Sequence, residues 1–280
     1  MNYYKDLLTI GIHCYNEARY LKQTIESCID QAGTVLVSDN ASTDNTQEVC
    51  EELAKKYPNL IYRRHKENIG ATANYLSNVE ATKTKYFMML GAHDYLDEGY
   101  AQNMLHMLEN SEAAGCYPVS RSVDINGKEI GLYKCWFADR LTSDSPSKRV
   151  YALIAHLHEV SAFFGIFHTE LVKKHLIKSM IGNDHAFVCN MALEGRLIES
   201  PYSIYNWRQT KMGLSDAENV KIWQETLGNA QNKIAVSRKE MRDEQLNILK
   251  KCGFKSIGFF EKILLIRKAE KKLRKRFGSN

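Results

Sequence analysis

The sequence contains no run of eighteen apolar residues, so no transmembrane helix is expected. Its first ten residues, MNYYKDLLTI, lack the basic stretch followed by an apolar stretch that marks a secretory signal. Proline is scarce, with four residues in 280, while 44% of the residues are hydrophobic and 25% are charged. This composition excludes a disordered or fibrous chain. It predicts one large α/β domain with an appended segment.

Paired cysteine motifs are also absent. The seven cysteines are odd in number and scattered, and none forms a CxxC pair. This pattern argues against a disulfide framework and against a zinc site. It predicts reduced, mostly buried cysteines that act as small hydrophobic residues in a cytoplasmic protein.

A net basic charge is lacking in residues 1–260 and is concentrated near the C-terminal end. Residues 261–280 hold eight lysines and arginines against two glutamates, a net charge of +6, which leaves −1 for the rest of a chain whose total is +5. A nucleic-acid-binding body would need a basic excess, so we expect no nucleic acid partner. Apolar residues recur among these charges, which predicts that residues 257–277 form an amphipathic helix on an anionic membrane surface. A packing helix of a homo-oligomer and a solvated charged helix are the alternatives.

Apolar runs alternate with helical periodicity through the first ninety residues. The predicted strands are residues 7–14, 34–37, 60–63 and 86–90, and the predicted helices are residues 18–30, 46–57 and 71–81. This alternation is typical of βαβ crossovers and predicts an α/β fold with a doubly wound, mostly parallel sheet and helices on both faces. Ligands of such sheets bind beyond the carboxyl ends of the strands. The polar clusters at residues 15–17, 39–46 and 91–94 are therefore expected to converge.

The second half of the chain is less regular. Residues 114–123 predict a strand, which is followed by a hairpin that turns at Asn126 and Gly127. Residues 139–148 are rich in turn formers and predict a loop. Helical periodicity marks residues 150–158, 171–178 and 185–196, and most of residues 216–250.

Four segments, taken in order, resemble glycosyltransferase family 2, whose members have the GT-A fold. They are residues 10–17, which end in Tyr-Asn-Glu, residues 38–46 (SDNASTDNT), residues 67–70 with Asn74, and residues 90–96 (LGAHDYL). One short motif alone has a high false-positive rate, whereas four in the right order are hard to match by chance. The resemblance covers roughly residues 7–210 and implies a GT-A domain over residues 1–215, followed by a helical region over residues 216–280. Within that domain, residues 1–110 form the nucleotide-sugar-binding half and residues 111–215 the acceptor-binding half.

The resemblance implies an inverting enzyme that transfers a sugar from a nucleotide diphosphate donor, first of all a UDP-sugar, to a glycan or lipid-linked acceptor. Bacterial surface polysaccharide or lipooligosaccharide synthesis is the implied setting. The residues implied to contact the donor are Tyr15, Asn16, Glu17, Asp39, Asn68, Asn74 and Arg208. Asp39 falls in the base-binding segment, and the guanidinium of Arg208 suits the diphosphate. The alternatives are helix or turn capping for Glu17 and Asn68, and a surface ion pair for Arg208.

A divalent cation, Mn²⁺ or Mg²⁺, is implied as the cofactor that stabilises the leaving diphosphate. The Asp-x-Asp metal motif of the family falls on Gly91, Ala92 and His93, so both of its aspartates are missing. His93 and the following Asp94 are the candidate ligands that remain. Packing or capping is the alternative for His93.

Inversion at the anomeric carbon needs a general base beside the acceptor hydroxyl. Residues 181–196 resemble the acidic segment that precedes a helix in the family, which makes Asp184 the candidate base. Its alternative is the N-cap of a helix that begins near His185. A catalytically degenerate nucleotide-sugar-binding or scaffold protein, and a nucleotidyltransferase, are the competing functions. We expect a cytoplasmic protein held peripherally at the inner face of the membrane.

Overall fold

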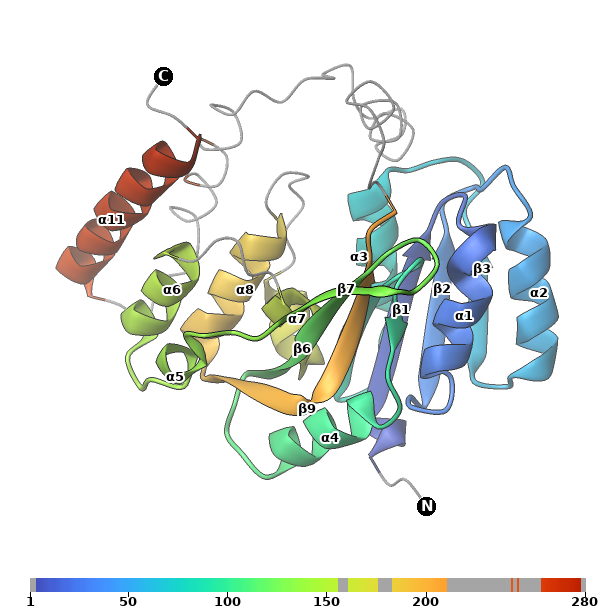
Figure 1. Ribbon diagram of the computed structural model, residues 1–280, viewed down its shortest axis with the longest axis horizontal. Coiled ribbons are helices and arrows are strands. Elements are labelled where there is room, and N and C mark those ends of the chain that lie inside the picture. Colours follow the sequence, from blue (N-terminus) through green and yellow to red (C-terminus); the bar gives the residue numbers. More distant parts are fainter. Residues whose placement is uncertain are drawn as a thin grey trace.

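The computed structural model describes residues 4–155, 161–175, 183–210, 243, 246 and 258–277. In these residues a nine-stranded sheet has the order β3-β2-β1-β4-β8-β6-β9-β5, with β7 added to β6 (Figure 1). The strands are β1 (Leu8–Cys14), β2 (Thr34–Asp39), β3 (Leu60–Arg64), β4 (Tyr86–Gly91), β5 (Tyr95–Leu96), β6 (Gly115–Val123), β7 (Glu129–Tyr133), β8 (Ile166–His168) and β9 (Leu197–Arg208). The α-helices are α1 (Ala18–Cys28), α2 (Thr46–Lys56), α3 (Ala71–Ala81), α4 (Tyr100–Glu109), α5 (Ala138–Leu141), α6 (Pro146–Ala155), α7 (Thr169–Lys174), α8 (Asn183–Glu194) and α11 (Phe259–Phe277). Short 3-10 helices span Lys5–Leu7 and Ser161–Phe164.

The strand directions bring the ends of distant strands to one edge of the sheet. β3, β2, β1 and β4 are parallel neighbours, as predicted. β8 is antiparallel to both β4 and β6, so β6 runs in the direction of β4, and β9 is parallel to β6. The sheet is therefore mixed, and the carboxyl ends of β1, β2, β4, β6 and β9 face the same way.

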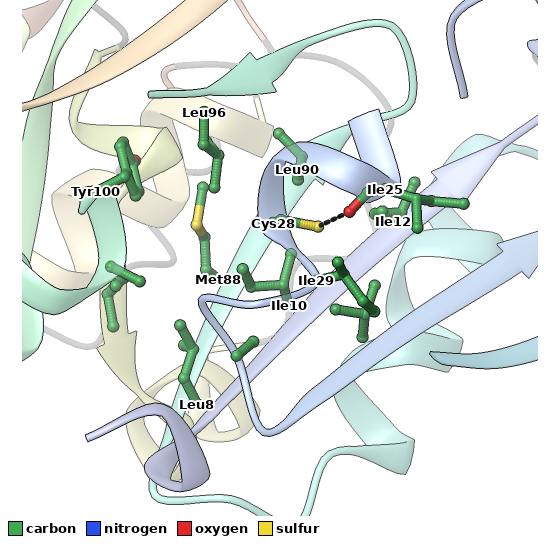
Figure 2. Close-up of a cluster of buried hydrophobic side chains, with 14 of the residues drawn as sticks. Leu8, Ile10, Ile12, Ile25, Cys28, Ile29, Met88, Leu90, Leu96 and Tyr100 are labelled. Carbon is green, nitrogen blue, oxygen red and sulfur yellow. Dashed lines mark hydrogen bonds between the residues drawn. The ribbon is translucent and has the colours of Figure 1, made fainter. Parts of the chain in front are cut away.

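Helices cover both faces of the sheet, and each face has its own hydrophobic core. Successive residues of β4 alternate between the two cores, because side chains of a strand point to opposite faces. Phe87 and Met89 join the core under α3, α6, α7 and α8, while Met88 and Leu90 join the core under α1, α2 and α4. Figure 2 shows the second core, in which side chains of β1, β4 and α1 meet. The predicted α/β fold, a doubly wound sheet with helices on both faces, is thus confirmed.

The elements of the first half follow the predictions closely, and α3 has the predicted bounds. The hairpin after β6 is also present, with Gly127 at a φ of 87° in its turn. The loop predicted at residues 139–148 is wrong in part, because it includes most of α5 and the start of α6. The helix predicted from residue 185 begins two residues earlier, at Asn183. The helices predicted within residues 216–250 lie almost wholly outside the described residues.

The C-terminal helix α11 lies beside α6, at the end of the molecule opposite α2 (Figure 1). Leu265 and Ala269 are buried and belong to the core that includes Val150 of α6. Leu264 is 56% exposed. Part of the apolar stripe predicted to face a membrane surface is therefore used for packing within the chain. In the described part of the chain, no helix combines the length and apolarity needed to span a bilayer.

Candidate active site

The loops that follow β1 and β2 are tied to each other by hydrogen bonds. The backbone N–H of Asn16 donates to Ser42 Oγ at 2.9 Å, and Asn16 Oδ1 accepts from the backbone N–H of Thr43 at 2.8 Å. The backbone N–H of Glu17 donates to Thr46 Oγ1 at 3.1 Å. Asn16 has a φ of 57°, a conformation that asparagine adopts more readily than most residues. The convergence predicted for residues 15–17 and 39–46 is therefore present.

Asp44 caps two helices from this junction. One carboxylate oxygen accepts from the backbone N–H of Ala18, the first residue of α1, at 3.1 Å. The other accepts from the backbone N–H and the hydroxyl of Thr46, the first residue of α2, at 3.0 and 2.5 Å. A carboxylate beside two helix N-termini is stabilised by their free N–H groups and dipoles. Asp44 thereby fixes the angle between α1 and α2 next to the loops.

Asp39, the predicted base contact, is fully buried at the end of β2. Its Oδ1 accepts from the backbone N–H and hydroxyl of Ser42 at 2.8 and 2.6 Å, and its Oδ2 accepts from the hydroxyl of Tyr62 at 2.7 Å. Arg64 lies 3.6 Å from Oδ2. A ligand cannot touch this carboxylate in the present conformation, because no part of it is exposed. Asp39 instead holds the loop after β2 in shape.

Asparagines form a second junction beside the first. Asn40 Nδ2 donates to Asn68 Oδ1 at 2.7 Å, and Asn40 Oδ1 accepts from the backbone N–H of Ile69 at 2.8 Å. Asn68 Oδ1 also accepts from the backbone N–H of Gly70, so Asn68 has the turn-capping contact that the sequence left open. Asn74 of α3 is buried and donates to the backbone carbonyl of Ser38 at 3.0 Å. These contacts connect the turn before α3 to the end of β2.

The loop after β4 contacts the loop after β1 through His93. His93 Nδ1 lies 2.9 Å from Glu17 Oε1, and both side chains are partly exposed. The Glu17 side chain makes no capping hydrogen bond at the start of α1, so the capping alternative is not realised. Tyr15, in the turn before α1, is half-buried.

His13 lies near the end of β1. Burial and the nearby charge of His93 lower the pKa of His13 to about 4, which leaves its imidazole neutral.

Asp94, the other candidate metal ligand, points inward. Its Oδ1 accepts from the backbone N–H of Arg208 at 2.8 Å, and its Oδ2 accepts from the hydroxyl of Tyr205 at 2.7 Å. Burial raises the pKa of Asp94, although the charge of His93 and these two hydrogen bonds oppose the rise. Among the described residues, no three His, Cys, Asp or Glu side chains gather closely enough to hold a metal ion. The conformation of Asp94 does not fit a Mn²⁺ or Mg²⁺ ligand.

Arg208 ends β9 and reaches the loops of the first half. Its Nε donates to the carbonyl of His93 at 2.8 Å, its Nη1 to the carbonyl of Ile125 at 3.0 Å and its Nη2 to Gln23 Oε1 at 2.7 Å. The guanidinium also lies over the ring of Tyr20, 4.7 Å from its centroid. Arg208 is only 4% exposed. In this conformation it fastens the end of β9 to the β4 loop and to α1.

Asp184 lies in the first turn of α8, inside the helix rather than at its N-cap. Its Oδ1 accepts from the backbone N–H of His185 at 2.8 Å and lies 3.2 Å from His185 Nδ1. Burial would raise the pKa of Asp184, but the hydrogen bonds and charge of His185 outweigh it and lower the pKa below its ordinary value. α8 ends three residues before β9 begins, and its twelve residues span about 18 Å, so its first turn lies toward the carboxyl ends of the strands.

The structure thus brings Tyr15, Asn16, Glu17, Asp39, Asn68, Asn74, His93, Asp94 and Arg208 to one edge of the sheet. Within the described part of the chain, no hydrogen bond or ion pair joins Asp184 to them, and only the direction of α8 relates Asp184 to that edge. Sequence reasoning missed the contact of Tyr205 with Asp94, named Gly91 only as a position that lacks an aspartate, and treated Asp44 only as part of a motif. The Ser-Thr-Asp-x-Thr spacing of residues 42–46 was the available signal for the double cap.

Comparison with known proteins agrees with this arrangement. The family model described as glycosyl transferase family 2 matches residues 9–177, more than half of the chain. The minor teichoic acid biosynthesis protein GgaB of Bacillus subtilis is 32% identical over 101 residues, which are 34% of this chain and 11% of that protein. Abequosyltransferase RfbV of Salmonella typhimurium is 32% identical over 96 residues, 32% of this chain and 29% of that protein. The chain therefore matches less than a third of the length of either relative.

Solved structures show the same fold at low identity. TarS 1-349 of S. aureus in complex with UDP-GlcNAc has a TM-score of 0.68 and 16% identity, covering 96% of this chain and 72% of that one. Mannosyltransferase PcManGT of Pyrobaculum calidifontis, in complex with GDP-Man and Mn²⁺, has a TM-score of 0.58 and 14% identity, covering 97% and 71%. From its family match, its ordered motifs and its GT-A fold, the chain belongs to glycosyl transferase family 2.

Proposed function

We propose that this protein transfers a sugar from a nucleotide diphosphate donor to a glycan or lipid-linked acceptor with inversion, in the synthesis of a bacterial surface polysaccharide. The observation that carries the proposal is the junction of the loops after β1, β2 and β4 at one sheet edge, through the Asn16–Thr43 and Glu17–His93 contacts. Ligands of parallel sheets bind at such an edge. A relative named for teichoic acid biosynthesis and a fold neighbour bound to UDP-GlcNAc support the acceptor class and a uridine donor.

The donor-binding half is residues 1–110 and the acceptor-binding half residues 111–215. In the first half, Tyr15, Asn16 and Glu17 form a partly exposed turn that we assign to direct contact with the nucleotide. Asp39, Asn68 and Asn74 are assigned to the shape of the surrounding loops, since their hydrogen bonds are made within the chain. Arg208 is assigned to the diphosphate as a buried positive charge behind the β4 loop. No step of the reaction is assigned to a metal ion.

Asp184 is assigned as the general base. An ionised carboxylate is needed to accept the acceptor hydroxyl proton while the oxygen attacks the anomeric carbon and the nucleoside diphosphate leaves from the opposite face. The lowered pKa keeps Asp184 ionised at neutral pH, and its side chain is 34% exposed. Its place at the start of α8 suits an acceptor that arrives over the second half of the sheet.

The test is a panel of nucleotide sugars with wild-type protein, Asp184→Asn and the surface control Asp30→Asn. We expect one donor to be turned over, and Asp184→Asn to lower kcat by about 10²–10⁴-fold with donor affinity unchanged. Asp30→Asn should behave as wild type, since Asp30 is exposed in the turn after α1. Binding of a donor without turnover would favour the scaffold alternative. Full activity of Asp184→Asn would remove Asp184 from the mechanism.

We further propose that α11 attaches the protein to the cytoplasmic face of an anionic membrane mainly through charge. Its buried residues Leu265 and Ala269 face the core, which leaves less apolar surface for insertion. Its exposed basic residues are Arg267, Lys268, Lys271, Lys272, Arg274 and Lys275. Each basic residue near such a surface contributes about 1 kcal/mol, and salt screens the attraction.

Vesicle sedimentation separates this attachment from the homo-oligomer alternative. We expect binding to vesicles that contain phosphatidylglycerol, not to phosphatidylcholine alone, and loss of binding at high salt. Lys271→Ser with Lys272→Ser should weaken binding by roughly thirtyfold, from about 1 kcal/mol for each charge. The matched control removes the exposed Lys55 and Lys56 from α2, at the other end of the molecule. Equal loss in both double variants, or a dimer without vesicle binding, would contradict the assignment.

A further inference from the structure

Asp94, the acidic residue that follows β4, points into the protein. Asp94 is 3% exposed, and each of its two carboxylate oxygens accepts a hydrogen bond from β9, one from the Tyr205 hydroxyl and one from the Arg208 backbone N–H. The hydroxyl of Tyr205 in turn accepts from the backbone N–H of Gly91 at 3.2 Å. These contacts join the end of β4 to the end of β9 across 111 residues of sequence.

Gly91 provides the space for this conformation. A Cβ atom at position 91 would lie 2.4 Å from Asp94 Oδ2 and 3.2 Å from its Cγ. Such a distance is far below van der Waals contact, so any larger side chain there would displace the carboxylate. The inward position of Asp94 therefore depends on the absence of a side chain at position 91.

This arrangement leaves few atoms with which to hold a divalent cation. Mg²⁺ and Mn²⁺ are bound by carboxylate oxygens that point at the ion from about 2.0–2.2 Å. Both oxygens of Asp94 point at β9 instead, and His93 Nδ1 contacts Glu17. Position 91 carries no side chain at all. The donor set at the end of β4 does not match the one that the family resemblance implies.

We infer that Asp94 is a structural residue that joins the end of β4 to β9, and that this protein binds its nucleotide donor without a divalent cation held at the end of β4. We call the hydrogen bonds of Asp94 to Tyr205 and to the Arg208 backbone N–H the latch. This inference rests on the proposed donor function. The backbone of residues 91–94 is held by β9 rather than by an ion. Substitutions that remove the latch hydrogen bonds lower the stability of the protein. Removal of divalent cations leaves the affinity for the donor unchanged.

Two measurements on the full chain test the inference. In the first, isothermal titration calorimetry gives the Kd of UDP and of UDP-GlcNAc in EDTA and in Mn²⁺. We expect the two conditions to agree within about twofold. Tightening by Mn²⁺ of about tenfold or more that disappears in Asp94→Asn would overturn the inference, because it would make Asp94 a ligand.

In the second, melting temperatures are measured for Asp94→Ala, Tyr205→Phe and the double variant, each with and without Mn²⁺. A latch predicts that both single variants melt lower and that their effects are not additive, since each removes the same contact. It also predicts no effect of Mn²⁺ on any variant. Additive effects, or a Mn²⁺ stabilisation seen only when Asp94 is present, would refute the latch. Failure of every nucleotide to bind would contradict the proposed function, while the melting temperatures would still decide the latch.

Discussion

Replacing Gly91 with alanine is the sharpest test of how the site is built. The added methyl carbon would lie 2.4 Å from Asp94 Oδ2, so the carboxylate has to move away from Tyr205. Overpacking costs about 1–3 kcal/mol, and a buried hydrogen-bonding group left without its partner costs about 1–3 kcal/mol more. We therefore expect the free energy of unfolding to fall by about 2–6 kcal/mol. For a chain of this size, at about 2 °C per kcal/mol, that corresponds to a Tm lower by roughly 4–12 °C.

Differential scanning calorimetry of Gly91→Ala and Gly131→Ala measures this effect against a matched control. Gly131 also lies in a strand, but a Cβ there would meet its nearest neighbour, the hydroxyl of Tyr133, at an ordinary 3.6 Å. The control variant should melt within a few degrees of wild type, since surface changes rarely exceed about 0.5 kcal/mol. Equal Tm values for the two variants would show that the space at position 91 is not needed, and the account of Asp94 would fail.

Two further substitutions test the ends of β1 and β2. His13 stays neutral in the folded protein down to a pKa of about 4 but takes up a proton near 6.5 when unfolded, so acidification removes stability. Between pH 7 and pH 5 the loss in free energy of unfolding is roughly 2 kcal/mol. Urea denaturation at the two pH values should show a smaller loss in His13→Gln than in wild type. An unchanged pH dependence in the variant would contradict the lowered pKa of His13. Asn40→Ala removes the hydrogen bond to Asn68 Oδ1 and the acceptor of the Ile69 backbone N–H. Loss of the two hydrogen bonds should cost about 1–3 kcal/mol in the same assay and weaken donor binding. Wild-type donor affinity would separate this turn from the site.

The first half of the fold could be predicted because local signals agree there. Each predicted strand is a short apolar run with a polar cluster after it, and α3 matches its predicted bounds. The second half departs from this pattern. α6 begins at Pro146 inside a predicted loop, although proline at the first helical position after a serine is itself a start signal. The many turn-forming residues of this segment led to the prediction of a loop instead of a helix that begins at Pro146.

The motifs located the sheet edge, but they did not give the orientation of its side chains. Asp94 was predicted to face a ligand, and it faces Tyr205, which lies 111 residues later in the sequence. Tyr205 itself is completely buried in a strand, where periodicity predicts only a core residue. Contacts between distant strands decide such orientations, and no local pattern contains them. The same limit applies to Arg208, whose guanidinium was predicted to meet phosphate and is 96% buried beside His93 and Gln23.

Hydrogen–deuterium exchange with and without a saturating nucleotide sugar tests the central claim most directly. The account predicts slower exchange in peptides that cover residues 14–18, 40–46 and 91–95, because the three loops meet at one edge and would share one ligand. Peptides from α11 should serve as an internal control with unchanged exchange, because that helix lies at the far end of the molecule. Protection confined to another part of the chain, or to only one of the three loops, would contradict a shared donor site.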